Sequence, residues 1–133
     1  GDNLCTDDRS HQAFRKMVRD QAWQDDFLSR PLSIRDEMAK AVRYRSESGK
    51  TLKASAIMDV TQRAVDDVMR LHGVELLIHG HTHRPAIHQF SLPESTSVHR
   101  VVLGDWSQAP SFIRFDQHTL ELVHAGISDR LVI

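Results

Sequence analysis

The stretch that decides the fold is VELLIHGHTHRP, residues 74–85, in which an apolar run leads into three alternating histidines. The run over residues 74–78 is short, aliphatic and soon followed by glycine, so it predicts a buried strand rather than a helix. In an extended segment, side chains two residues apart share one face, which would bring together His79, His81 and His83. Neutral imidazole binds metal ions near pH 7, and open α/β sheets bind ligands where strands end. The stretch therefore predicts a metal site at the end of a strand.

Two neighbours of the histidines should shape this loop. We expect Gly80 to let the backbone turn out of the strand, and Pro85 to prevent a helix from forming there. The simplest alternative is a polar surface loop without any chemistry, because a short motif also matches by chance.

The bulk composition is that of an ordinary globular domain. The chain has 133 residues, of which 40% are hydrophobic and 26% charged, and its formal net charge is −1. A charge so close to zero gives no overall field toward nucleic acid, and we expect no nucleic-acid partner. The single cysteine, Cys5, excludes an internal disulfide and fits a reducing compartment.

Nothing in the sequence predicts a membrane span or a signal peptide. No apolar run approaches the roughly 20 residues that a transmembrane helix needs. The chain opens with Gly1-Asp2 rather than methionine, and we interpret it as a chain whose true N-terminus is missing.

The first half of the chain has helical periodicity. Apolar residues three and four apart predict helices over residues 9–28, 31–48 and 59–72. Asp8 is one of several expected N-caps for the first helix, and Gly73 is the expected end of the third.

After the histidines the pattern changes to short strands. Residues 86–92, 98–103, 111–115 and 119–124 are rich in strand-forming residues and are separated by turn residues. Apolar residues two apart within them are typical of half-buried antiparallel strands. The predicted fold class is therefore α/β, an α+β sandwich with helices first and a strand meander second.

A basic cluster lies between Lys40 and Lys53. It holds five basic residues against the single acid Glu47, with serine, threonine and glycine interleaved. Such a cluster suits phosphate, whose oxygens accept charge-assisted hydrogen bonds from lysine and arginine. The alternative is a solvated helix face, which is what most charge runs are.

The GHTH block at residues 80–83 resembles the last metal-binding block of the calcineurin-like metallophosphoesterases. Within that superfamily, GDNLCTDD at residues 1–8, IMDV at 57–60 and LGDW at 103–106 are similar to the pyrophosphohydrolases that act on UDP-2,3-diacylglucosamine in lipid A synthesis. The resemblance covers essentially the whole chain. It implies an active-site loop over residues 1–8, a helical insertion or lid over 9–56, and the C-terminal half of the metallophosphoesterase core over 57–133.

The resemblance also implies a set of site residues. Two Mn²⁺ ions are expected in the complete enzyme, with the catalytic ligand His83 on one ion and His81 on the other, and with most ligands on a missing N-terminal half. The residues expected to bind substrate are Asp8, Ser46, Lys50, Lys53 and His81. Supporting neighbours of the site would be His79, Arg43, Phe14 and His11. Asp105 and Trp106 are interpreted as a turn cap and a core anchor.

The implied reaction is hydrolysis of UDP-2,3-diacylglucosamine to UMP and 2,3-diacylglucosamine 1-phosphate, by water attacking the α-phosphorus. The implied location is peripheral, on the cytoplasmic face of the bacterial inner membrane, and the isolated half should be inactive. Six apolar residues of the insertion would either hold acyl chains or form an ordinary helix core: Phe14, Met17, Val18, Ile34, Met38 and Val42. Two other readings stay open, a metallophosphoesterase for another phosphoester or nucleotide and a non-catalytic scaffold.

Overall fold

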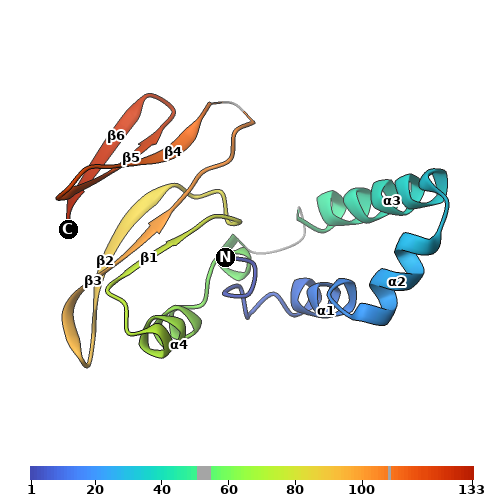
Figure 1. Cartoon of the computed structure of the whole chain (residues 1–133), viewed down its shortest axis with the longest axis horizontal. Coiled ribbons are helices and arrows are strands. Elements are labelled where there is room, and N and C mark those ends of the chain that lie inside the picture. Colours follow the sequence, from blue (N-terminus) through green and yellow to red (C-terminus); the bar gives the residue numbers. More distant parts are fainter. Residues whose placement is uncertain (51–54, 108) are drawn as a thin grey trace. The chain divides into compact units, whose positions relative to one another are not determined.

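The computed structural model describes residues 1–50, 55–107 and 109–133, with the side chains of residues 47, 49, 50, 55, 56 and 96 outside that description. The chain divides into two compact units (Figure 1). The sheet unit comprises Gly1–Cys5 and Val60–Ile133, and the helical unit comprises Thr6–Asp59.

The described residues of the helical unit form three α-helices and a short 3-10 helix. Their bounds are Arg9–Val18 for α1, Gln21–Ser29 for α2, Leu32–Lys50 for α3 and Ser55–Met58 for η1. The single helix predicted over residues 9–28 is wrong, because Asp20 breaks it. The Asp20 backbone is extended and its carboxylate accepts a hydrogen bond from the backbone N–H of Trp23 at 3.0 Å, which starts α2 afresh.

The helical unit buries little of its apolar surface. No residue of α1 or α2, both fully described, is buried. The rings of Trp23 and Phe27 stack with their centroids 5.1 Å apart, one turn apart along α2. Local contacts of this kind, rather than a core, hold the described helices in shape.

The sheet unit is built from α4 (Gln62–His72) and six strands in two sheets. The first sheet has the order β1-β3-β2, with bounds Leu76–His79, Ser95–Val102 and Ala86–Leu92; β1 is parallel to β3 and β2 is antiparallel to it. The second sheet is the antiparallel series β4-β5-β6, with bounds Ser111–Phe115, Thr119–His124 and Ile127–Val132.

Both faces of the first sheet are covered by apolar side chains. Val98 of β3 packs with Val65 and Met69 of α4. Val101, three residues further along β3, points to the opposite face and packs with Leu120 and Leu122 of the second sheet. The layers are therefore α4, the first sheet and the second sheet (Figure 1). Burying one such side chain stabilises the fold by about 1.5–3 kcal/mol, so these two clusters fix the sheet unit. The mixed α and β content agrees with the predicted class.

The segment Gly1–Cys5 belongs to the sheet unit because Leu4 is buried in the cluster beside α4. The Leu4 carbonyl also accepts a hydrogen bond from the backbone N–H of Thr61 at 2.9 Å. The helix predicted from residue 59 begins at Gln62, with Thr61 as its N-cap residue, and Gly73 ends it at φ 61° as predicted. Within the described residues, no helix is long and apolar enough to cross a membrane.

Candidate functional site

The candidate site lies where β1 and β3 end. These strands are parallel, so their carboxyl ends meet at one edge of the first sheet, and the Leu103 N–H donates to the His79 carbonyl at 2.8 Å. The end of β1 leads into residues 80–85, here called the histidine loop, and the end of β3 leads into Gly104 and Asp105. Ligand sites in open α/β sheets occupy this position.

The backbone of the histidine loop is not extended. His81 has φ 83° and His83 has φ 55°, in the left-handed region that residues with a Cβ rarely adopt. The expectation that three alternating rings share one face is therefore wrong, because the strand ends at His79. The chain leaves the strand at Gly80 as expected, but the positive φ angles fall on the two histidines and not on the glycine. Such strain of about 1–3 kcal/mol per residue is concentrated at functional sites.

His79 is set apart from the other two histidines by burial. Its side chain is on the α4 face of the sheet, and the residue is 6% exposed. Its Nε2 lies 3.2 Å from Nη1 of Arg100, which can only donate, so Nε2 accepts and Nδ1 carries the proton. Nδ1 then donates to the Gly80 carbonyl at 2.9 Å. With both nitrogens engaged, His79 supports the loop and does not offer a lone pair to a metal.

Gly1 packs tightly against the start of the histidine loop. A Cβ at position 1 would overlap the carbonyl oxygen of Gly80 and lie 3.1 Å from Nδ1 of His79. Only glycine fits here without displacing backbone. The fold thus brings Gly1 beside His79 and Gly80.

His83 faces a carboxylate from the end of β3. Its Nδ1 is 3.5 Å from Oδ2 of Asp105, and the same oxygen accepts a hydrogen bond from the Ser107 hydroxyl at 2.7 Å. Trp106, predicted as a core anchor, is instead 70% exposed. Its indole N–H is satisfied by the Ser111 carbonyl at 2.8 Å, so the side chain is held on the surface and the prediction is wrong.

The donor set of the loop fits part of a metal site. His81 and His83 are both exposed and differ in sequence by two residues, and imidazole is a common ligand for divalent transition metals. A ring whose Nδ1 faces a carboxylate keeps Nε2 for a cation, which is the usual arrangement around metal-bound histidine. Across residues 1–50, 55–107 and 109–133, no three His, Cys, Asp or Glu side chains gather to hold an ion by themselves. A complete site would need ligands from elsewhere.

The substrate residues expected near the start of the helical unit have local partners. The Asp8 carboxylate caps α1, accepting from the His11 N–H at 3.0 Å and from the Ser10 hydroxyl at 2.8 Å. Asp8 is 8% exposed, whereas Phe14 in the same helix is 37% exposed.

The basic cluster of α3 is only partly described. Arg43 and Ser46 are three residues apart on this exposed helix, and therefore lie on one side of it. Lys40 is held by an ion pair of 2.6 Å with Asp36, one turn earlier. The side chain of Lys50 and the whole of Lys53 lie outside the described residues, so both remain predictions.

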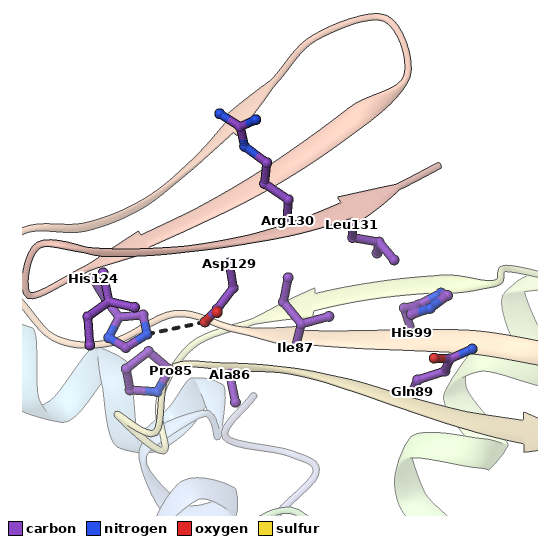
Figure 2. Close-up of a pocket in the computed structure, with 10 residues that line it drawn as sticks. Pro85, Ala86, Ile87, Gln89, His99, His124, Asp129, Arg130 and Leu131 are labelled. Carbon is purple, nitrogen blue, oxygen red and sulfur yellow. Dashed lines mark ion pairs between the residues drawn. The ribbon is translucent and has the colours of Figure 1, made fainter.

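A separate hollow of about 620 Å³ lies in the sheet unit (Figure 2). Its lining comes from β2, β3, β6 and the end of β5, together with Pro85, and excludes His81 and His83. Figure 2 shows the side chains of His124 and Asp129 next to each other in its lining, with 3.6 Å between Nε2 and Oδ2. This hollow therefore holds a second histidine–carboxylate pair outside the histidine loop.

The sequence indicated neither the contact of Arg100 with His79 nor the contact of Asp105, interpreted as a turn cap, with His83. Asp105 follows a strand just as the histidines do, and two parallel strands end at the same edge. The position of Asp105 after a strand could be seen in the sequence, but its place beside the histidine loop follows only from the parallel pairing of β1 with β3. Arg100 carries no motif, and only the register places it beside His79.

Comparison with curated proteins finds several relatives that share one name. No family model matches the chain. It is 52% identical to the UDP-2,3-diacylglucosamine hydrolase of Chromohalobacter salexigens over 106 residues, which are 80% of this chain and 43% of that protein. The corresponding protein of Aromatoleum aromaticum is 49% identical over 116 residues, 87% of this chain and 47% of that one. That of Escherichia coli O81 is 44% identical over 124 residues, 93% of this chain and 51% of that one.

The chain spans about half the length of the curated relatives it matches. Identity of 43–52% over 80–93% of a chain is far above what unrelated sequences share. The resemblance found from the sequence is therefore confirmed, and the chain belongs to the family of the UDP-2,3-diacylglucosamine hydrolases.

Proposed function

We propose that this chain forms part of a hydrolase that cleaves the pyrophosphate of UDP-2,3-diacylglucosamine, giving UMP and 2,3-diacylglucosamine 1-phosphate. The observation that carries the proposal is its identity of 43–52% with proteins named for hydrolysis of this compound. The metallophosphoesterase-like α/β core and the reaction at the α-phosphorus are part of the same proposal.

Two Mn²⁺ ions are the proposed cofactors, with His83 as a ligand of one ion and His81 as a ligand of the other. The remaining ligands would come from the half of the relatives' length that this chain does not span. A bound pair of ions would clamp the attacking and leaving oxygens and lower the pKa of a bound water. The support within this chain is the exposed pair of imidazoles and the carboxylate beside His83.

The chain's own contribution to substrate binding is countercharge for the pyrophosphate. Arg43 and the hydroxyl of Ser46 would donate to phosphate oxygens from one side of α3, joined by Lys50 and Lys53. Asp8 is proposed to contact the substrate in addition to capping α1. His11 and Phe14 of α1 would lie next to these substrate-binding residues and support them.

The acyl chains of the substrate would contact the apolar side chains of the helical unit. Four of the six residues considered for this role are more than a third exposed rather than buried in a helix core: Phe14 37%, Met17 45%, Ile34 38% and Val42 40%. Each apolar side chain shielded by lipid would gain roughly 25 cal/mol per Å² of covered surface. A lid that holds lipid fits peripheral contact with the cytoplasmic face of the inner membrane.

The test uses a polypeptide of the relatives' full length that contains these 133 residues. UMP release from UDP-2,3-diacylglucosamine is measured with Mn²⁺, alongside hydrolysis of the generic diester bis(p-nitrophenyl) phosphate. We expect the acylated sugar nucleotide to be strongly preferred. Equal kcat/KM on the two compounds would assign the protein to another phosphoester, and no hydrolysis of either would favour a scaffold.

A further inference from the structure

The segment that carries Asp105 is held by contacts with Ser111 and Pro85. The backbone N–H of Gly104 donates to the Ser111 hydroxyl at 2.8 Å, and the Trp106 indole donates to the Ser111 carbonyl at 2.8 Å. A Cβ at Gly104 would lie 3.3 Å from Cγ of Pro85, so this segment packs closely against the end of the histidine loop. The Asp105 backbone is thus held where its side chain can reach the loop.

The carboxylate of Asp105 is also oriented. Its Oδ2 accepts the Ser107 hydroxyl hydrogen bond at 2.7 Å and lies 3.5 Å from Nδ1 of His83. A carboxylate that faces Nδ1 favours the tautomer with the proton on that nitrogen. The lone pair of His83 is then on Nε2, the nitrogen away from Asp105.

The simplest explanation is an ordinary surface ion pair, but a comparison of its free energy with the cost of the His83 backbone conformation argues against it. The side chains are 56% and 45% exposed, and an exposed pair contributes about 0–1 kcal/mol. The left-handed backbone of His83 costs about 1–2 kcal/mol. The ion pair therefore stabilises the fold by less than the backbone conformation of His83 costs, and stability alone does not account for the arrangement.

We infer that Asp105 is a positioning residue that holds the His83 ring with Nε2 turned to a divalent cation, and that Ser107 in turn fixes the carboxylate. This inference rests on the proposed function, because it assumes that His83 is a metal ligand. It assigns to the end of β3 a role in the site that the histidine motif does not reveal.

The chain offers a matched control in the same unit. Asp129 faces His124 across 3.6 Å, with half of its side chain exposed, and their hollow is lined by Pro85 as well (Figure 2). This pair has the chemistry of the Asp105–His83 pair but neither of its members is in the histidine loop. Removing Asp129 thus deletes a similar charge close to the loop without touching His83.

The experiment titrates a polypeptide of the relatives' full length, containing this chain, with Mn²⁺ alone and counts bound ions by electron paramagnetic resonance of the free ion. We expect His83→Ala to lose one of two ions. Asp105→Ala should weaken that same ion about 10–100-fold, the usual effect of removing a group that orients a metal-bound histidine. Asp105→Asn should weaken it less, because the amide oxygen still accepts from Nδ1. Ser107→Ala should have the smallest effect.

The outcomes separate this inference from the proposed function. Asp129→Ala with wild-type affinity for both ions, and an unchanged melting temperature of Asp105→Ala, would support a positioning role. Wild-type affinity in Asp105→Ala, with one ion lost in His83→Ala, would overturn the inference and leave the metal proposal standing. The inference would also be overturned if Asp129→Ala weakened Mn²⁺ binding as much as Asp105→Ala does, or if Asp105→Ala weakened the binding of both ions equally. Wild-type binding in His83→Ala would instead remove the metal proposal itself.

Discussion

The sheet unit and the helical unit are stabilised in different ways. The first sheet is covered on both faces, and side chains such as Met69 and Leu122 are completely buried. The fully described α1 and α2 bury no residue, and the helical unit instead shows caps and exposed ion pairs one turn apart, such as Arg30–Asp26 at 2.7 Å. Short helices without tertiary packing are marginal in water. A unit that keeps its apolar side chains exposed is suited to binding, while the packed unit is suited to holding ligands rigidly.

The largest effect on activity should come from the sheet unit. His83→Ala in a polypeptide of the relatives' full length should lower turnover on the order of 10³-fold, because a lost ligand removes several kcal/mol of charge stabilisation. The measurement is UMP release with Mn²⁺. His124→Ala is the control, since this ring pairs with Asp129 outside the histidine loop. Wild-type turnover in His83→Ala would contradict the assignment.

Two leucines provide a direct test of the contrast in packing. Leu122 is fully buried between the sheets, whereas Leu28 in α2 is 61% exposed. Leu122→Ala should cost about 2–5 kcal/mol of unfolding free energy, through lost burial and a cavity. Leu28→Ala should change it by less than about 0.5 kcal/mol. Urea unfolding followed by circular dichroism measures both, and similar losses would show that the helical unit has a core of its own.

Much of the fold was predictable because local signals agreed with the final pairing. Strands β2, β4 and β5 match the predicted ranges, since turn residues mark their ends. Strand β6 was missed because ISDRLV alternates weakly, and the turn before it uses a positive φ at Ala125, which no sequence rule favours. The break at Asp20 was missed because apolar periodicity continues across it.

The candidate site was less predictable because it depends on long-range pairing. The pattern of three histidines identified the loop, but it could not separate buried His79 from exposed His81 and His83. That separation follows from the left-handed backbone after β1 and from the contact with Arg100, 21 residues away. Asp105 joined the site only through the parallel pairing of β1 with β3.

The next effect tests the helical unit as the substrate-binding part. Lys53→Ala should raise KM and lower turnover, with kcat/KM falling about 10–100-fold, because a charge-assisted hydrogen bond contributes about 1.5–3 kcal/mol. Metal content, measured by mass spectrometry, should not change. Lys40→Ala is the matched control, because Asp36 already engages that ammonium group at 2.6 Å. Loss of metal without a change in KM would contradict the assignment of Lys53 to substrate binding.

The smallest effect concerns a charge network on the second sheet. Register places Glu121 of β5 between Arg114 and Arg130, and its carboxylate accepts hydrogen bonds from Ser128 and both guanidinium groups. The Ser128 hydrogen bond is the largest cause that lowers the pKa of Glu121, followed by the charges of Arg114 and Arg130, while desolvation opposes them. The folded state therefore favours ionised Glu121 more than the unfolded chain does.

The sign of the resulting pH dependence follows from that lowered pKa. Stabilisation by Glu121 is fully present above its ordinary pKa of 4.5 and is lost as the pH falls through the lower folded value. Wild-type protein should consequently lose more stability between pH 6 and pH 3 than Glu121→Gln, and Ser128→Ala should fall between them because it removes the largest cause. Urea unfolding at a series of pH values measures the difference. If Glu121→Gln followed the wild-type curve, the network would be a surface feature that contributes nothing to the packed unit, and the contrast between the units would rest on apolar burial alone.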